Sequence, residues 1–184
     1  MPTRRSGWRT GPRGETSRLF EELSRQDIER RIAASHADVR DIYDYWRSKL
    51  TERGLPRRAD IDPLEIRRFL GAITIVDVVP DARRFVYRLV GTLDAAIRGY
   101  DPTGKSVAEA FFGGTLEETL SCYEYVVRTA GPFCYRDPYP VSDGNFEQDD
   151  LIYLPLSDDG CAVSNVLIFC HSYHASRRSG GSAF

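Results

Sequence analysis

The stretch ITIVDVVPDARRFVYRLVGT, residues 73–92, decides the fold class of this chain of 184 residues. Its first part, Ile73 to Val79, is a run rich in β-branched residues. Its second part, Arg84 to Val90, alternates large apolar residues with arginine and valine. Because Pro80 to Arg83 has the composition of a turn, the pattern predicts two antiparallel strands joined as a hairpin.

Helical and extended segments follow this hairpin in separate blocks. Short helices are expected at 93–98 and 107–111, and the apolar spacing of 115–130 predicts a longer amphipathic helix. Three more strands are expected at 133–141, 146–156 and 161–173, the last two joined by a turn that contains Asp-Gly. Blocks of helices and antiparallel strands indicate an α+β fold with a five-stranded antiparallel sheet and short helices on one face.

The segment 35–50, upstream of the hairpin, carries the clearest helical pattern. Ser35 followed by Asp38 resembles a capping box. Five apolar residues then share one face of the helix, at a spacing that predicts a buried stripe. They are Val39, Ile42, Tyr43, Trp46 and Leu50. This stripe covers either the outer face of the chain's own sheet or a second copy of the chain. A weaker helix is expected around 19–32, and a short one from Asp62 to Leu70.

The ends of the chain differ in composition from the middle. Residues 1–16 are rich in Arg, Gly, Pro, Ser and Thr, which predicts a flexible basic arm. Residues 174–184 are expected to be a loose tail. Between them, we expect an N-terminal helical extension over 17–70 and a core domain over 71–173.

Composition excludes several classes of protein. The formal net charge is −2, so binding of nucleic acid is not expected. There is no apolar run long enough to cross a bilayer, which makes a cytoplasmic location without membrane contact the expectation. Four cysteines without a C-x-x-C pair are interpreted as small buried apolar residues in a reducing compartment.

Five short motifs and the order of the predicted elements now point to a family. The motifs are YDYWRSK (43–49), LPRRADIDP (55–63), YRLVGT (87–92), GYDPTGKSV (99–107) and LPLSDDG (154–160). Over residues 38–172 the chain resembles the PAS domain, and specifically a proteobacterial single-domain PAS family formerly classed as a domain of unknown function. The resemblance implies a sensor or interaction module without catalytic activity, which commonly dimerises through a helix before the first strand.

A ligand pocket between the sheet and its short helices is the first candidate site. Strand alternation and helical spacing direct an aromatic set of residues to this space. They are Phe85, Tyr87, Leu89, Arg98, Phe111, Tyr123, Val127, Phe133 and Tyr135. Such a pocket suits a small organic ligand, and Arg98 could pair with an acidic one. The alternative is that these side chains fill the core completely. No cofactor is predicted.

A phosphate-binding loop is the second candidate site. Gly99 to Ser106 fits G-x-x-x-x-G-K-S, in which Gly99, Gly104, Lys105 and Ser106 would hold a nucleotide. Such a loop needs a strand before it and a helix after it, whereas residues 93–98 are predicted to be helical. A further alternative is a small cone-shaped isomerase that uses an aspartate and a tyrosine in an apolar pocket.

The histidines carry no predicted metal or haem site. His36 lies at the start of the leading helix, while His171 and His174 lie near the end of the last strand, so all three are expected at the surface. The sequence therefore predicts a non-enzymatic, cytoplasmic PAS sensor or adaptor that forms a homodimer and acts on an unknown signalling protein.

Overall fold

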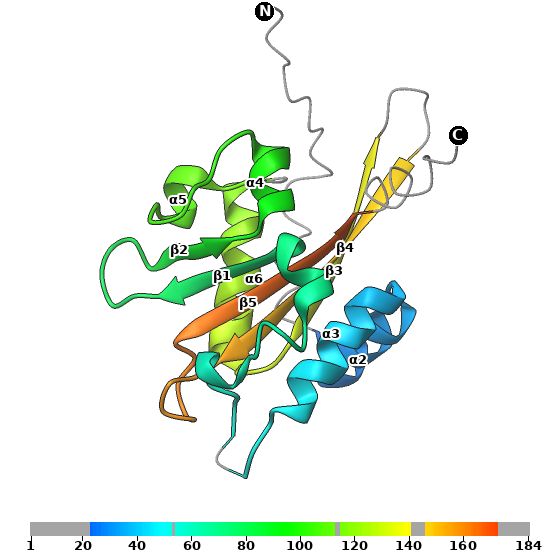
Figure 1. Cartoon of the computed structure of the whole chain (residues 1–184), viewed down its shortest axis with the longest axis vertical. Helices are drawn as coiled ribbons and strands as arrows, with labels where there is room; N and C mark the ends of the chain where they lie inside the picture. Colours follow the sequence, from blue (N-terminus) through cyan, green and yellow to red (C-terminus); the bar gives the residue numbers. More distant parts are fainter. Residues whose placement is uncertain (1–22, 53, 113–114, 141–145, 173–184) are drawn as a thin grey trace, which may run out of the picture.

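A five-stranded antiparallel sheet forms the centre of the molecule in the computed structural model, which describes residues 23–52, 54–112, 115–140 and 146–172 (Figure 1). The strand order is β2-β1-β5-β4-β3. The strands are β1 Ile73–Val78, β2 Phe85–Val90, β3 Phe133–Pro140, β4 Phe146–Leu156 and β5 Asn165–Ser172. All four neighbouring pairs are antiparallel, so the predicted α+β fold with a five-stranded antiparallel sheet is confirmed.

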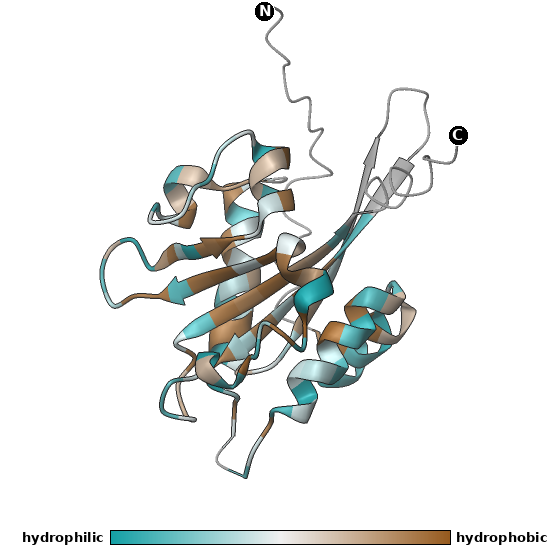
Figure 2. Ribbon diagram, in the orientation of Figure 1, coloured by the Kyte–Doolittle hydropathy of each residue, from teal (hydrophilic) through white to brown (hydrophobic). Residues whose placement is uncertain are grey.

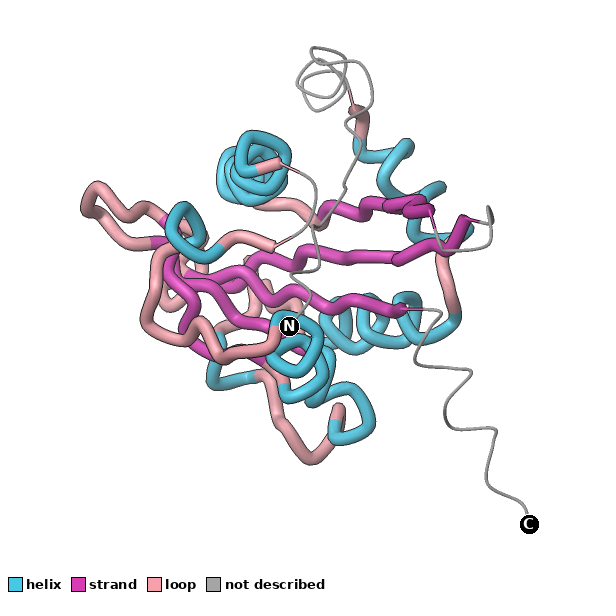
Figure 3. Tube along the Cα trace, turned by 90° about the horizontal axis from the view of Figure 1, so that it is seen from above, coloured by secondary structure: helices cyan, strands magenta, loops and turns pink. Residues whose placement is uncertain are grey.

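Helices lie on both faces of the sheet (Figure 3). The inner face is covered by α4 (Thr92–Arg98), α5 (Val107–Ala110) and α6 (Leu116–Thr129). The outer face is covered by α2 (Arg25–Ala34), α3 (Ala37–Ser48) and the 3-10 helix η2 (Arg67–Ala72). A second 3-10 helix, η1 (Arg58–Asp60), lies in the connection between α3 and η2. Apolar residues concentrate in the strands and on the helix faces that contact them (Figure 2).

The predicted hairpin forms, but its register contains an irregularity. Val76 pairs with Tyr87, whereas the preceding residue Ile75 pairs with Leu89, so Arg88 is an extra residue in β2. A β-bulge of this kind reverses the side-chain alternation beyond it. Leu89 therefore shares the outer face with Ile75 and is 45% exposed. Its predicted place beside Phe85 and Tyr87 is wrong because of this bulge.

Two predicted helix starts differ in the structure. The N-cap of α3 is His36, whose ring nitrogen accepts a hydrogen bond from the backbone N–H of Asp38. Ser35 is instead the C-cap of α2, and its hydroxyl lies 3.2 Å from the Cys134 thiol. In place of the expected α-helix over 62–70, residues 63–66 form turns and residues 67–70 belong to the 3-10 helix η2.

Helix α3 packs its apolar stripe onto the outer face of the chain's own sheet. Val39, Ile42, Tyr43 and Trp46 are buried there, and Leu50 is 42% exposed. The indole N–H of Trp46 donates a hydrogen bond of 2.9 Å to the carbonyl oxygen of Pro155 in β4. The hydroxyl of Tyr43 donates to Glu29 of α2, and burial together with this carboxylate raises the pKa of Tyr43 to about 12.

Other sequence-based predictions have mixed outcomes. Cys122 and Cys134 are buried as expected, but Cys161 is exposed on the β4–β5 loop. The basic arm 1–16 and the tail 174–184 lie outside the described residues. None of the described helices combines the length and the apolar character that a bilayer span requires.

Candidate functional site on the inner face of the sheet

Aromatic rings pack closely between the sheet and α6. Tyr123 of α6 stacks on Phe85 of β2 with ring centres 5.0 Å apart and meets Tyr153 of β4 edge-on at 5.4 Å. Phe133 of β3 contacts Tyr153 at 6.0 Å and Tyr125 of α6 at 5.1 Å. All five side chains are buried, so this part of the inner face is an aromatic core.

A positive charge lies at one end of this aromatic core. The side chain of Arg98, from the last turn of α4, is only 8% exposed. Its guanidinium lies 5.0 Å from the ring centre of Tyr87 and 5.1 Å from that of Phe112, the geometry of cation–π contacts. Arg98 also donates hydrogen bonds to the Asp94 carboxylate at 2.9 Å and to the Ala110 carbonyl at 3.0 Å.

The surroundings of Arg98 shift several pKa values. Burial raises the pKa of Tyr87, and burial raises that of Tyr123 well above its usual value. Burial alone would lower the pKa of Arg98, but Asp94 and Tyr87 keep it above its ordinary value. At neutral pH the site therefore offers one guanidinium cation and two neutral hydroxyl groups.

This topology has a counterpart among known families. Residues 34–167, more than half of the chain, match the family described as PAS domain. The chain belongs to the PAS domain family. The match begins inside the segment 17–70 that was predicted to be an extension, and it ends within β5.

Several solved structures show a limited similarity to this PAS domain. A light-oxygen-voltage domain studied with a flavin analogue is 12% identical, with a TM-score of 0.43, over 65% of this chain and 94% of that one. The PAS domain of a Colwellia psychrerythraea protein is 15% identical, with a TM-score of 0.41, over 60% and 97%. VqmA, solved bound to DPO, is 16% identical, with a TM-score of 0.46, over 61% and 58%. No curated protein matches the chain.

The PAS fold brings most of the predicted pocket residues together. Phe85, Tyr87, Tyr123 and Phe133 are buried on the inner face with Arg98 beside them. Tyr135 and Val127 are half-buried at the margin of this core.

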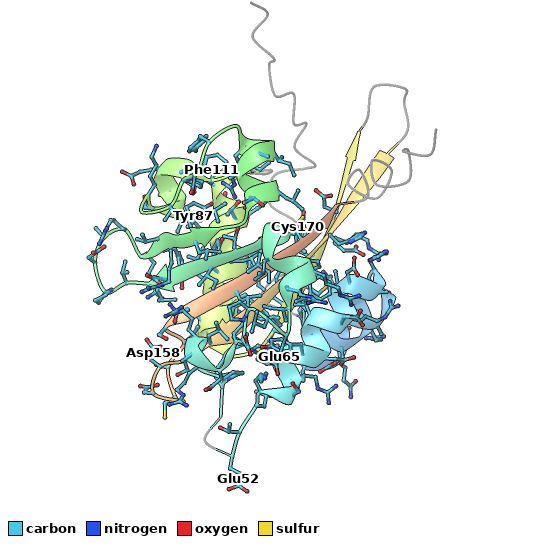
Figure 4. The ribbon with its side chains drawn as sticks, in the orientation of Figure 1. Glu52, Glu65, Tyr87, Phe111, Asp158 and Cys170 are labelled. Carbon is cyan, nitrogen blue, oxygen red and sulfur yellow. The ribbon has the colours of Figure 1, made fainter. Side chains whose placement is uncertain are left out.

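Other residues lie differently from the prediction. Leu89 is on the outer face, as described above. Phe111 is 40% exposed and lies at the same end of the molecule as Tyr87 (Figure 4). The prediction missed Tyr153. Strand alternation places Leu151 and Tyr153 on the same face of β4, and this pattern was available as a signal. It also missed Asp94, which lies one helix turn before Arg98 in α4, and Phe112, which only the tertiary structure brings to Arg98.

Two surface hollows among the described residues of this PAS domain lie away from the aromatic core. One, of about 530 Å³, lies between the loop after α3 and the β4–β5 loop, where Figure 4 labels Glu52 and Asp158. The other, of about 720 Å³, lies along α2. No residue predicted to line the ligand pocket lines either hollow. The aromatic side chains of the inner face are themselves buried and pack against one another.

The segment Gly99–Ser106 does not have the geometry of a phosphate-binding loop. It follows helix α4, not a strand, and it pairs with the edge strand β2: the Gly104 N–H donates to the Tyr87 carbonyl, and the Tyr87 N–H donates to the Lys105 carbonyl. The Ser106 hydroxyl and backbone N–H both bind the carboxylate of Glu109. The backbone N–H groups of residues 103–106, which a phosphate in such a loop would need, are thus engaged within the chain.

We expect Lys105→Ala to have little effect. Lys105 is exposed and its ammonium lies 5.1 Å from the ring centre of Tyr100, a weak surface contact. The free energy of unfolding, measured by urea titration, should change by less than about 0.5 kcal/mol. Calorimetric titration with magnesium-ATP should show no binding by either protein. Magnesium-dependent ATP binding that disappears in Lys105→Ala would contradict this geometry.

Proposed function

We propose that this PAS domain is a non-enzymatic sensor of signal transduction whose inner-face site takes a small organic acid. The observation that carries the proposal is the guanidinium of Arg98, with a side chain only 8% exposed, at the end of an aromatic core. Burying a charged side chain in such a position costs desolvation free energy, whereas burying an apolar side chain does not. A few polar groups at the end of an apolar interior are also typical of sites for small molecules.

The contacts of Arg98 suggest how a ligand enters. Phe112, which covers one side of the guanidinium, is 44% exposed, and its neighbour Phe111 is 40% exposed. A flat organic group can take the place of the Phe112 ring without any change in the sheet. The carboxylate of the ligand would then compete with Asp94, which is hydrogen-bonded to Arg98 in the structure.

The output of the sensor is expected to pass through another protein. We retain the predictions of a homodimer, an unidentified signalling partner and a cytoplasmic location. Since the apolar stripe of α3 is buried against the chain's own sheet, we expect these contacts to use other surfaces.

Native mass spectrometry, followed by denaturing mass spectrometry of the same sample, tests the proposal. We expect the protein purified from bacterial cells to retain a small extra mass under native conditions and to lose it on denaturation. Arg98→Gln should lack this mass because the anion has lost its partner. Arg83→Gln is the matched control, since Arg83 is an exposed arginine that is also paired with an aspartate, Asp81.

A second variant probes the competition with Asp94. Asp94→Asn removes the competing carboxylate but keeps an acceptor for the Thr74 hydroxyl, which lies 2.8 Å away. We expect this variant to retain the small mass, and to bind benzoate more tightly than the wild type in calorimetric titrations. Benzyl alcohol, which lacks the charge, should gain nothing from the same substitution.

A bare wild-type protein that also fails to bind benzoate would contradict the ligand proposal. It would favour a second candidate function, an adaptor that works only through its surfaces. The close packing of buried aromatic rings on the inner face supports that candidate.

A further inference from the structure

Two histidines far apart in the sequence meet on the outer face of the sheet. Asp150 of β4 and His171 of β5 are paired residues in adjacent strands, so their side chains emerge side by side. The carboxylate of Asp150 is fully buried and accepts a hydrogen bond of 2.7 Å from the backbone N–H of His36. Asp150 therefore positions the start of α3 directly over His171. The prediction that His171 lies at the surface is wrong for this reason, His36 is one-third exposed, and His174 lies outside the described residues.

The imidazole rings of His36 and His171 stack on each other beside a carboxylate. Their ring centres are 3.5 Å apart, and the planes differ by 8°. One oxygen of Asp38 lies 3.1 Å from Nδ1 of His171 and 3.6 Å from Nδ1 of His36. The three residues can offer ligand atoms that all lie within 4.8 Å of one another.

These separations match those between ligands of one metal ion. Zinc binds imidazole nitrogen and carboxylate oxygen at about 2.0–2.2 Å, so two ligands of a tetrahedral ion lie roughly 3.4 Å apart. The distances from the Asp38 oxygen bracket that value. The third separation, of up to 4.8 Å, is longer, so one of the two imidazole rings must move for all three ligand atoms to reach one ion.

The electrostatic surroundings also suit a divalent cation. His171 is buried in the last strand beside the carboxylates of Asp38 and Asp150, so a cation here would lie among acidic side chains. Asp38 and Asp150 supply two negative charges, of which Arg136, 2.8 Å from Asp150, balances one. Asp38 and His36 are each about one-third exposed, so an ion can reach them from solvent.

We propose that His36, Asp38 and His171 form a binding site for a zinc ion, with water completing the coordination. Imidazole and carboxylate ligands in this number are a set that zinc accepts. The ion ties the first turn of α3 to the end of β5, and thus fastens the N-terminal helices to the sheet. The site lies on the face opposite to the aromatic core, so it does not depend on the proposed ligand site.

Zinc binding requires one ring to leave the stack, because the lone pairs of two parallel rings do not converge on one point. His36 is the ring that can turn, since it is one-third exposed while the side chain of His171 is only 9% exposed. Turning it breaks the hydrogen bond that caps α3 at the backbone N–H of Asp38. The structure thus links occupation of the site to the start of this helix.

Calorimetric titration of the untagged protein with zinc chloride tests the proposal. We expect one zinc ion per chain and a melting temperature that rises with zinc concentration. His171→Gln and His36→Ser should each weaken zinc binding roughly tenfold or more. Loss of a group that only supports a metal ligand already weakens metal binding by about that much, and these two residues are proposed ligands themselves. His36→Ser is the sharper variant because serine is a good N-cap, so the metal-free stability of α3 should be retained.

Two further measurements separate this site from incidental binding. Cys161→Ser removes an exposed thiol that could bind zinc elsewhere on the described surface, and should leave the zinc affinity unchanged. The nitrogen NMR signals of the His36 and His171 rings should shift on zinc addition. Unchanged affinity in His36→Ser and His171→Gln would overturn the proposal, as would loss of binding in Cys161→Ser or no saturable binding by the folded wild type.

Discussion

Replacement of Trp46 by alanine is expected to destabilise the protein by about 3–5 kcal/mol, a large part of the stability of a typical domain. Trp46 is only 4% exposed and packs between α3 and the outer face of the sheet. Removal of the Trp46 side chain leaves a cavity. The buried carbonyl of Pro155 also loses the hydrogen bond that it accepts from the indole N–H. Urea unfolding followed by circular dichroism measures the change.

The control for Trp46 lies on the opposite side of the same helix. Asp44 is exposed, so Asp44→Ala should change the free energy of unfolding by less than about 0.5 kcal/mol. Native mass measured for both variants distinguishes the two roles that the sequence allows for α3. A Trp46→Ala protein that keeps its stability and changes only from dimer to monomer would show that the helix is shared between two copies.

Replacement of Gly91 by alanine is expected to cost about 3 kcal/mol or more. The backbone of Gly91 has φ −63°, which alanine also adopts, so space alone decides the outcome. An added Cβ would lie 2.3 Å from the carbonyl oxygen of Gly71 and 2.8 Å from that of Ile73. Both are backbone atoms at the junction of η2 and β1, and they cannot rotate away as a side chain would.

Gly99 provides the comparison for Gly91. It has φ +81°, the left-handed region, but no atom lies within 4 Å of an added Cβ. Gly99→Ala should therefore cost only about 1 kcal/mol, the strain of that conformation. Equal urea midpoints for the two alanine variants would mean that the end of β2 is not packed against the η2–β1 junction as described.

The candidate site was predictable in part. Phe85, Tyr87, Tyr123 and Phe133 follow from local alternation and helical spacing, which are properties of the backbone alone. Leu89 could not be placed correctly because a bulge depends on how a strand pairs with its neighbour, which single-strand alternation does not contain.

The surroundings of Arg98 could not be predicted from local patterns. Its contact with Asp94 is within one helix turn, but Tyr87 and Phe112 reach it from β2 and from the segment after α5. The pairing of His36 with His171 is a stronger case, because it joins residues 135 positions apart through the carboxylate of Asp150. Such contacts depend on strand order and on helix docking.

The sequence by itself determined the α+β class, the order and approximate bounds of the strands and the membership of the PAS family, because these depend on periodicity and on local motifs. It also determined which face of α3 would be buried, but not whether its own sheet or a second copy would cover it. The tertiary structure decided that α3 covers the sheet, that Leu89 faces outward, and that Arg98 closes the end of the aromatic core. The physical reason is that contacts between distant segments determine which surfaces pack together, whereas the periodicity of apolar residues indicates only which side chains are buried.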